Sequence, residues 1–163
     1  MSPERGARGR NAGPARARAV AGAEYRVMTV RRLSDGVSDD WRAFWTERHV
    51  CLLTTLRRDG SPHVVAVNAT VDVDEGIARV MCSAGSQKER NVAARADQGG
   101  ARVALTQIEH GRWSTLEGTA VVRPEPEVVR DAEERYTLRY HVPRANPKRV
   151  VLEIAVERVL GLR

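Results

Sequence analysis

An Asp-Gly turn between two β-rich runs is the feature that most constrains how this chain folds. The segment VCLLTTLRRDGSPHVVAVNATVD, residues 50–72, places Val, Leu and Thr on both sides of Arg58-Asp59-Gly60-Ser61. Asp-Gly is a strong signal for a tight hairpin turn, and a tight hairpin joins antiparallel strands. The sequence therefore predicts a sheet built around an antiparallel hairpin.

The remaining patterns add strands and three helices to this hairpin. A second turn at residues 74–76 precedes a third strand at 77–83, and further strands are expected at 101–106, 113–122 and 150–162, with a break at Gly118. Trp41, Phe44 and Trp45 are spaced for one face of a helix within residues 38–49. Apolar spacing predicts two more helices, at 87–96 and 124–140. Six strands with peripheral helices indicate a mainly β fold, a small barrel.

The positive charge of the chain lies almost wholly at its N-terminus. Residues 1–32 carry eight arginines against two glutamates, which equals the net charge of +6 for all 163 residues. We expect these residues to form a disordered basic tail, because they are rich in Ala, Arg and Gly without apolar periodicity. Met28 is a candidate start codon just before the first predicted element. A basic tail on a neutral domain disfavours a nucleic-acid groove, which needs clustered charge on the folded face.

Sequence features also bear on compartment and metal binding. The chain has no apolar run of membrane-spanning length and no apolar segment typical of a secretory signal, so we expect it in the cytoplasm. Cys51 and Cys82 fall in separate predicted strands, and we expect buried reduced thiols. His49, His110 and His141 share no metal-ligand spacing, so no metal site is predicted.

The segment SAGSQKERN, residues 83–91, joins the third strand to the middle helix. Ser86 and Glu89 form an S-x-x-E capping box, which many ordinary helices carry. The same Gly-Ser turn leaves backbone N–H groups facing outward, with Lys88 beside them in the first turn, and this arrangement suits an anion. The residues alone leave both interpretations open.

The order of these segments resembles one family. The segments follow in this order: a helix, LTTLRRDGSPHVVAV, a strand, GSQKERN, a strand, RWSTLEGTAVV, a helix and RVVLEIAVERVLGL. This order is similar to that of the split β-barrel family of flavin and deazaflavin oxidoreductases, which contains pyridoxamine phosphate oxidase. The likeness covers residues 33–163 and is strongest to the branch that uses coenzyme F420. It implies a six-stranded split β-barrel of the FMN-binding type and a homodimer with cofactor sites at the interface. It also implies hydride transfer from reduced F420 to a conjugated planar acceptor, with biliverdin as the first expectation.

The resemblance also implies which residues bind the cofactor. The phosphate-binding stretch corresponds to Ser86, Gln87, Lys88 and Asn91, and the ring is expected against Thr54, Thr55, Pro62, His63, Val64 and Val65. Trp113 and Ser114 match the segment that closes the pocket, from the facing strand or subunit. Many family members carry arginine at the position of Ser86, so this chain offers one fewer cation to the phosphate.

The sequence leaves more than one hypothesis for the catalytic residue and for the cofactor. The proton donor is not identified. The candidate catalytic residues are His63, as a donor to the ring or the substrate, and Arg112, as a partner for a substrate carboxylate. Arg57 and Arg58 are candidates for the acidic tail of F420 or for tetrapyrrole propionates, or are merely solvated charges beside the turn. An FMN-dependent oxidoreductase of the pyridoxamine phosphate oxidase type is the second hypothesis. A non-catalytic F420 or tetrapyrrole carrier is the third, and a nucleic-acid adaptor acting through the tail is the fourth.

Overall fold

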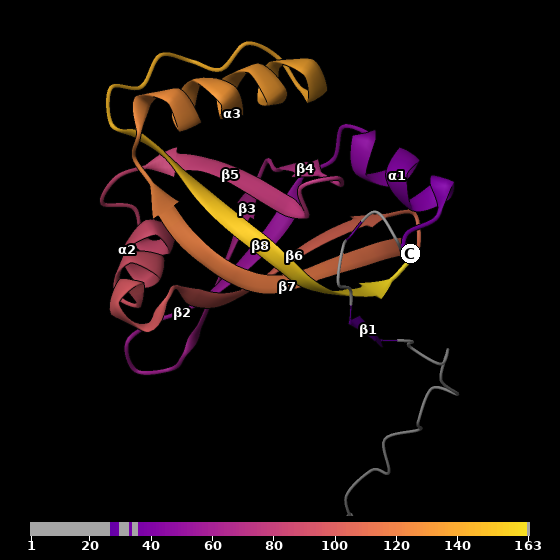
Figure 1. Cartoon of the computed structure of the whole chain (residues 1–163), viewed down its shortest axis with the longest axis horizontal. Coiled ribbons are helices and arrows are strands. Elements are labelled where there is room, and N and C mark those ends of the chain that lie inside the picture. Colours follow the sequence, from indigo (N-terminus) through magenta and orange to yellow (C-terminus); the bar gives the residue numbers. More distant parts are fainter. Residues whose placement is uncertain (1–26, 30–32, 34–35, 163) are drawn as a thin grey trace, which may run out of the picture.

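The computed structural model describes residues 27–29, 33 and 36–162, which form one antiparallel sheet with three helices around it (Figure 1). The strand order is β3-β2-β6-β7-β8-β5-β4, and β1 pairs with β8. The strands are β1 (Val27–Thr29), β2 (Cys51–Leu56), β3 (Pro62–Val67), β4 (Thr70–Asp72), β5 (Ile77–Ser83), β6 (Ala101–Glu109), β7 (Arg112–Arg123) and β8 (Arg149–Gly161). The helices are α1 (Asp39–Thr46), α2 (Gln87–Ala93) and α3 (Pro126–Arg139), and a short 3-10 helix spans Ala96–Gln98.

This architecture confirms the predicted mainly β split barrel, with two strands more than the six expected. The extra strand β4 exists because the chain leaves the sheet edge at Asn68 and Ala69, so the run predicted as one strand is divided in two. The other, β1, pairs through Val27–Thr29 with β8, whereas the sequence predicted no regular structure before residue 33. Residues 1–26 and 30–32 of the predicted tail lie outside the described residues.

The predicted aromatic stripe of α1 lies in the core. Ser38 caps the helix by accepting a hydrogen bond from the backbone N–H of Trp41 at 3.2 Å. Trp41, Phe44 and Trp45 are all buried, as their spacing predicted. They close one end of the barrel, while α2 lies at the other end (Figure 1).

Gly118 does not break β7 as predicted but places a bulge in it. The strand runs unbroken through Gly118, and its register with β8 shifts between Glu117 and Gly118. A Cβ atom at residue 118 would lie 2.0 Å from the backbone oxygen of Ala155. The glycine therefore lets β7 and β8 approach closely where the sheet curves.

Arg139, at the end of α3, fastens that helix to the barrel. It is buried and donates to the backbone oxygens of Ala69 at 2.6 Å and Glu47 at 2.7 Å, and to Oε1 of Gln107 at 2.7 Å. Three segments far apart in the sequence are held by this one guanidinium. Among the helices in the described ranges, none has the length and apolarity needed to cross a bilayer.

The two cysteines are buried free thiols, as predicted. Burial raises the pKa of Cys51 to about 11 and also raises the pKa of Cys82. Both side chains are therefore thiols rather than thiolates near neutral pH.

Candidate cofactor site

A chain of polar side chains joins α2 to the first hairpin. Nε2 of Gln87 donates to Oδ1 of Asn91 at 2.7 Å, and Nδ2 of Asn91 donates to Oγ1 of Thr55 at 2.8 Å. Thr55 and Asn91 are buried, and Nδ1 of His63 lies 3.4 Å from the same Thr55 hydroxyl. The structure thus brings four of the predicted site residues together.

The N-terminus of α2 differs from the predicted capping box. Glu89 reaches back to the backbone N–H of Gly85 at 2.9 Å, one residue before the N-cap, and Ser86 forms no side-chain cap. Oγ of Ser86 is buried and has no oxygen or nitrogen partner in the described part of the chain; the Cys82 thiol is its neighbour there. The first-turn N–H groups of a helix also have no carbonyl within the helix to pair with. The turn therefore presents several hydrogen-bond donors together.

Positive charge converges on this turn. Burial lowers the pKa of His63, and the charges of Arg57 and Lys88 lower it further. Arg57 is held beside the hairpin by a 2.6 Å hydrogen bond from its guanidinium to the backbone oxygen of Pro62. Two cations, Arg57 and Lys88, are thus near enough to His63 to lower its pKa, and together with the donors of α2 they suit an anionic group.

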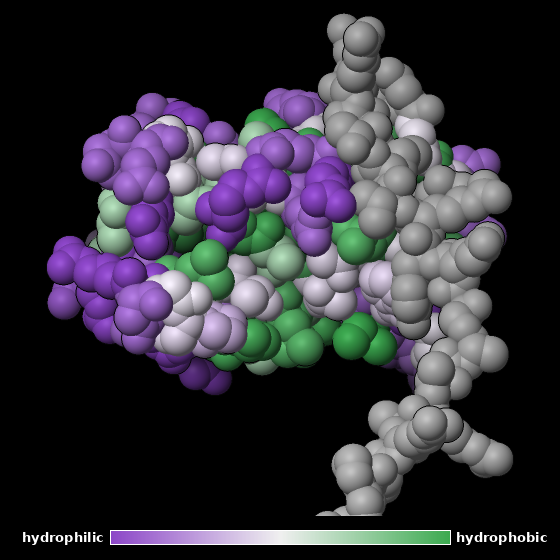
Figure 2. All heavy atoms as spheres, turned by 90° about the horizontal axis from the view of Figure 1, so that it is seen from below, coloured by the Kyte–Doolittle hydropathy of each residue, from purple (hydrophilic) through white to green (hydrophobic). Residues whose placement is uncertain are grey.

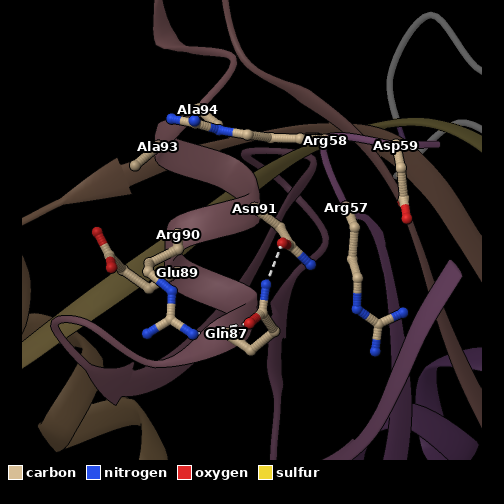
Figure 3. Close-up of a pocket in the computed structure, with 9 residues that line it drawn as sticks. All are labelled: Arg57, Arg58, Asp59, Gln87, Glu89, Arg90, Asn91, Ala93 and Ala94. Atoms are coloured by element: carbon tan, nitrogen blue, oxygen red, sulfur yellow. Dashed lines mark hydrogen bonds between the residues drawn. The ribbon is translucent and has the colours of Figure 1, made fainter. Parts of the chain in front are cut away.

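A groove of about 700 Å³ lies between α2 and the turn that joins β2 to β3 (Figure 3). Arg90 donates to Oε1 of Gln87 at 2.7 Å and to the backbone oxygen of Gly85, so its head lies over the first turn of the helix. The sequence predicted Arg90 as a surface residue; it is exposed and also lines the groove. The complete lining is Arg57, Arg58, Asp59, Gln87, Glu89, Arg90, Asn91, Ala93 and Ala94.

Three predicted residues lie at the other end of the sheet, beside α1. The Ser114 side chain is fully buried, and its hydroxyl accepts a 3.0 Å hydrogen bond from Nε1 of Trp41. Arg112 pairs with Glu47 at 2.9 Å, and its strand neighbour Trp113 pairs in register with Ile108. Within one chain, Arg112, Trp113 and Ser114 are therefore not brought to α2, and their assignment stays a prediction.

The other predicted ring contacts divide between the two faces of the first hairpin. Val65 lies inward and packs against the core, whereas Pro62 and Val64 are exposed on the opposite face and Thr54 is half-buried there. Residues directly opposite in an antiparallel pair share a face, and Thr54 pairs with Val64. The sequence pattern did not separate these two groups, because both faces of the hairpin carry apolar side chains.

The outward face is an exposed apolar surface. Figure 2 shows hydrophobic residues gathered in a band across the middle of this view, beside a hydrophilic end at the left. By strand register this band, which we call the apolar sheet face, includes Thr54 and Ala104 beside five exposed apolar residues, Val50, Leu52, Leu56, Val64 and Ile108. An exposed apolar patch of this kind marks an interaction surface.

Comparison with known proteins places these features in context. A family model described as pyridoxamine 5'-phosphate oxidase matches residues 37–163. An F420H(2)-dependent biliverdin reductase from Mycobacterium tuberculosis (strain CDC 1551 / Oshkosh) is 54% identical over 135 residues, which cover 83% of this chain and 92% of that protein.

Solved structures agree in fold. A conserved hypothetical protein from Mycobacterium tuberculosis, Rv2991, superposes with a TM-score of 0.60 at 27% identity, covering 76% of this chain and 82% of the other. A structure titled F420 reductase superposes with a TM-score of 0.56 at 21% identity, covering 76% of this chain and 98% of the other. The extent of the family match and the identity to the reductase together show that this chain belongs to the pyridoxamine 5'-phosphate oxidase family.

Proposed function

We propose that this protein is an F420H2-dependent reductase that transfers a hydride to a conjugated planar acceptor, with biliverdin as its substrate. The observation that carries the proposal is the identity of 54% to the biliverdin reductase over nearly the whole of that protein. A relative this similar over its full length supports the same class of cofactor. The α2 site supplies an independent physical test of that cofactor.

The residues at the start of α2 fit a phosphate diester such as the one in F420. Within the described residues the buried Ser86 hydroxyl has only the weakly bonding Cys82 thiol as a neighbour and no oxygen or nitrogen partner, so a bound phosphate oxygen would satisfy it. Lys88 and the first-turn N–H groups add charge-assisted donors, each contributing about 1.5 to 3 kcal/mol before desolvation costs. Position 86, which carries arginine in many family members, here offers a neutral hydroxyl, and this favours a monoanionic diester over the dianionic phosphate of FMN.

The inward side of the first hairpin supports and orients the cofactor ring. Bound reduced F420 supplies the hydride, so the protein needs to hold the ring and exclude water. Thr55 and His63 are held by the polar chain from α2, and Val65 packs against the core on the same face of the hairpin. Fixing ring and acceptor in the reacting geometry accounts for several kcal/mol of the barrier in reactions of this kind.

We further propose that the protein acts as a homodimer through the apolar sheet face. The face carries five exposed apolar side chains, and burying it against a second copy removes them from water. Such a partner also offers a place for Trp113 and Arg112, which do not reach α2 in their own chain, whereas the Ser114 side chain is buried against Trp41 and is not available to it. The proposed reaction takes place in the cytoplasm, where buried reduced thiols are the expected form of Cys51 and Cys82.

Anaerobic turnover tests the proposed reaction. The full chain is mixed with reduced F420 and biliverdin, and the recovery of the oxidised F420 absorbance is followed together with the loss of the biliverdin bands. Stoichiometric, enzyme-dependent exchange of the two signals supports the proposal. F420 binding without biliverdin reduction removes the substrate assignment, and binding of both ligands without oxidation of F420H2 favours a carrier.

Two controls complete this assay. The Lys88→Ala variant should lose most turnover at limiting F420, since it lacks the side-chain cation at the turn. Arg130 lies exposed on α3, away from the site, so Arg130→Ala is the matched loss of one surface charge and should keep full turnover. FMN replaces F420 in a parallel reaction, where activity would support the second hypothesis.

A further inference from the structure

The barrel opens at the junction of β3 and β4. Thr70 to Asp72 of β4 pair with Ile77 to Arg79 of β5, and this ladder stops where Asn68 and Ala69 carry the chain into β3. Among the described residues, β5 therefore has no paired strand on its β4 side over Val80–Ser83, and β3 pairs with β2 alone. Asn68 lies between the end of β3 and the start of β4, which are the two edge strands of the sheet, and marks this opening.

A second groove, of about 600 Å³, lies at this opening. It is bounded by Asn68, by the end of β5 at Met81 to Ser83, by Tyr136 of α3, and by the segment from His141 to Arg149. Its volume is within the range of about 300 to 1,000 Å³ that is usual for small-molecule sites. The groove is separate from the one lined by Arg57 and Arg58, and the two share no residue.

The charges of this groove are all positive. Its charged side chains are Arg144 and Arg149, and no Asp or Glu lines it. Arg149 is engaged already: Nε lies 3.1 Å from Glu133, and a second nitrogen donates to the backbone oxygen of Arg144. The Arg144 guanidinium is exposed and forms no ion pair within the described part of the chain. Arg149 thus fixes the loop, and Arg144 remains for an anionic ligand.

Neutral donors and aromatic rings accompany this charge. Nδ2 of Asn68 donates to the Tyr136 hydroxyl at 2.8 Å, so the tyrosine proton is left to donate elsewhere. The rings of Tyr136 and His141 meet edge to face with centroids 5.5 Å apart. Met81 and Cys82 add apolar surface at the base. An aromatic and apolar wall with a cation and a hydroxyl at its rim suits a flat molecule that bears carboxylates.

The groove adjoins the phosphate turn of α2. Ser83 lines the groove, and its backbone oxygen accepts from the N–H of Ser86 at 3.1 Å. The Asn146 amide donates to the Ser83 hydroxyl at 2.9 Å, and the N–H of Ala84 donates to the oxygen of Lys148 at 2.8 Å. One short turn therefore separates the groove from the predicted phosphate site, with the 141–149 segment bonded to that turn.

We propose that this groove holds the electron acceptor, with Arg144 and the Tyr136 hydroxyl binding a carboxylate of a planar substrate. The inference rests on the proposed function, because it concerns the acceptor of that reaction. It goes beyond it by assigning the acceptor to the Asn68 opening and its carboxylate to Arg144, rather than to Arg57 and Arg58. The groove thereby selects planar acceptors with pendant carboxylates.

Equilibrium binding to the full chain tests this assignment. Biliverdin and its dimethyl ester, which lacks both carboxylates, are titrated into wild type, Arg144→Gln and Arg130→Gln while tryptophan fluorescence is followed. We expect Arg144→Gln to weaken biliverdin by about tenfold, the scale of one charge-assisted contact, and to leave the ester and F420 unchanged. Tyr136→Phe should weaken biliverdin in the same direction, and Arg130→Gln should change nothing.

Each contrary result is distinct. The assignment would be overturned if Arg144→Gln left the affinity for biliverdin unchanged, or if it weakened biliverdin and the ester equally. It would also be overturned if Arg58→Gln weakened biliverdin and Arg144→Gln did not. Failure of wild type to bind biliverdin would overturn it as well. Arg144-dependent binding without F420H2 oxidation would uphold the groove and remove the proposed reaction. If turnover occurs and the KM for biliverdin is the same in wild type and Arg144→Gln, the proposed reaction is upheld and the assignment of the groove is removed.

Discussion

The side-chain amide of Asn91 donates a 2.8 Å hydrogen bond to the hydroxyl of Thr55, and this buried bond joins α2 to β2. It fixes the helix whose first turn presents Ser86 and Lys88. The same Thr55 hydroxyl lies 3.4 Å from Nδ1 of His63. This contact therefore helps to fix the predicted phosphate turn relative to the predicted ring wall, together with the burial of Val92 of α2 in the core.

Removing the contact should lower both stability and cofactor affinity. Asn91→Leu leaves the buried Thr55 hydroxyl without its donor, and we expect the free energy of unfolding in urea to fall by about 1 to 3 kcal/mol. Thr55→Val in the same background should restore part of the loss, because both polar partners are then absent. Gln87→Ala removes the partly buried hydrogen bond from Gln87 to Asn91, so it should lower the free energy of unfolding less than Asn91→Leu does. Equal stability of wild type and Asn91→Leu would contradict this role.

His63 should make stability depend on pH below neutrality. Burial, Arg57 and Lys88 lower the pKa of His63 in the folded chain below its ordinary value of 6.5. The unfolded chain therefore binds this proton first, and stability falls as pH drops from about 6.5 through the folded pKa. His63→Gln should lack that part of the loss.

NMR titration of the His63 ring measures the effect directly. Lys88→Ala removes one of the two cations, so the His63 pKa should rise toward 6.5. A bound phosphate should also raise it by stabilising the charged ring. A His63 pKa at or above 6.5 in the free wild-type protein would contradict the predicted arrangement.

A charge placed in the apolar sheet face should separate a dimer. Leu52 and Val64 are exposed on this face, and Leu52→Asp would bury a carboxylate against the second copy at a cost of several kcal/mol. Light scattering after size exclusion should give twice the chain mass of 18.0 kDa for wild type and the single mass for the variant. Leu138 is 89% exposed on α3, so Leu138→Asp is the matched control and should stay dimeric. A monomeric wild type would remove the dimer from the proposal.

The bulge at Gly118 should tolerate no side chain. A Cβ there would lie 2.0 Å from the backbone oxygen of Ala155, so β7 and β8 would have to separate. We expect Gly118→Ala to lower the free energy of unfolding by about 3 kcal/mol or more. Gly99, at φ +80 with open space around its Cβ position, is the comparison, and Gly99→Ala should cost only about 1 kcal/mol through backbone strain. Similar losses in the two variants would contradict the packing argument.

Local signals predicted most of the fold. The Asp59-Gly60 turn, the spacing of Trp41, Phe44 and Trp45, and the alternation in β8 each depend on neighbours within a few residues, and each matches the structure. The sequence resemblance likewise grouped Gln87, Asn91, Thr55 and His63, which the structure joins by hydrogen bonds.

Features that depend on distant partners could not be predicted in this way. Arginine is seldom buried, and nothing local marks Arg139 as the residue that joins Glu47, Ala69 and Gln107. The burial of Ser114 follows from Trp41, which lies 73 residues away in sequence. The division of β3 from β4 at Asn68 is set by where β5 pairs, so the opening of the barrel was also absent from the local pattern.

Equilibrium titration with oxidised F420 and with FMN is the measurement that tests the central claim most directly. The account predicts that F420 binds the wild-type chain more tightly than FMN, with one molecule per chain, and that Lys88→Ala weakens F420 by about tenfold, the value of one charge-assisted contact. Arg130→Ala should bind F420 as wild type does. Tighter binding of FMN, or an F420 affinity that Lys88→Ala leaves unchanged, would contradict the account.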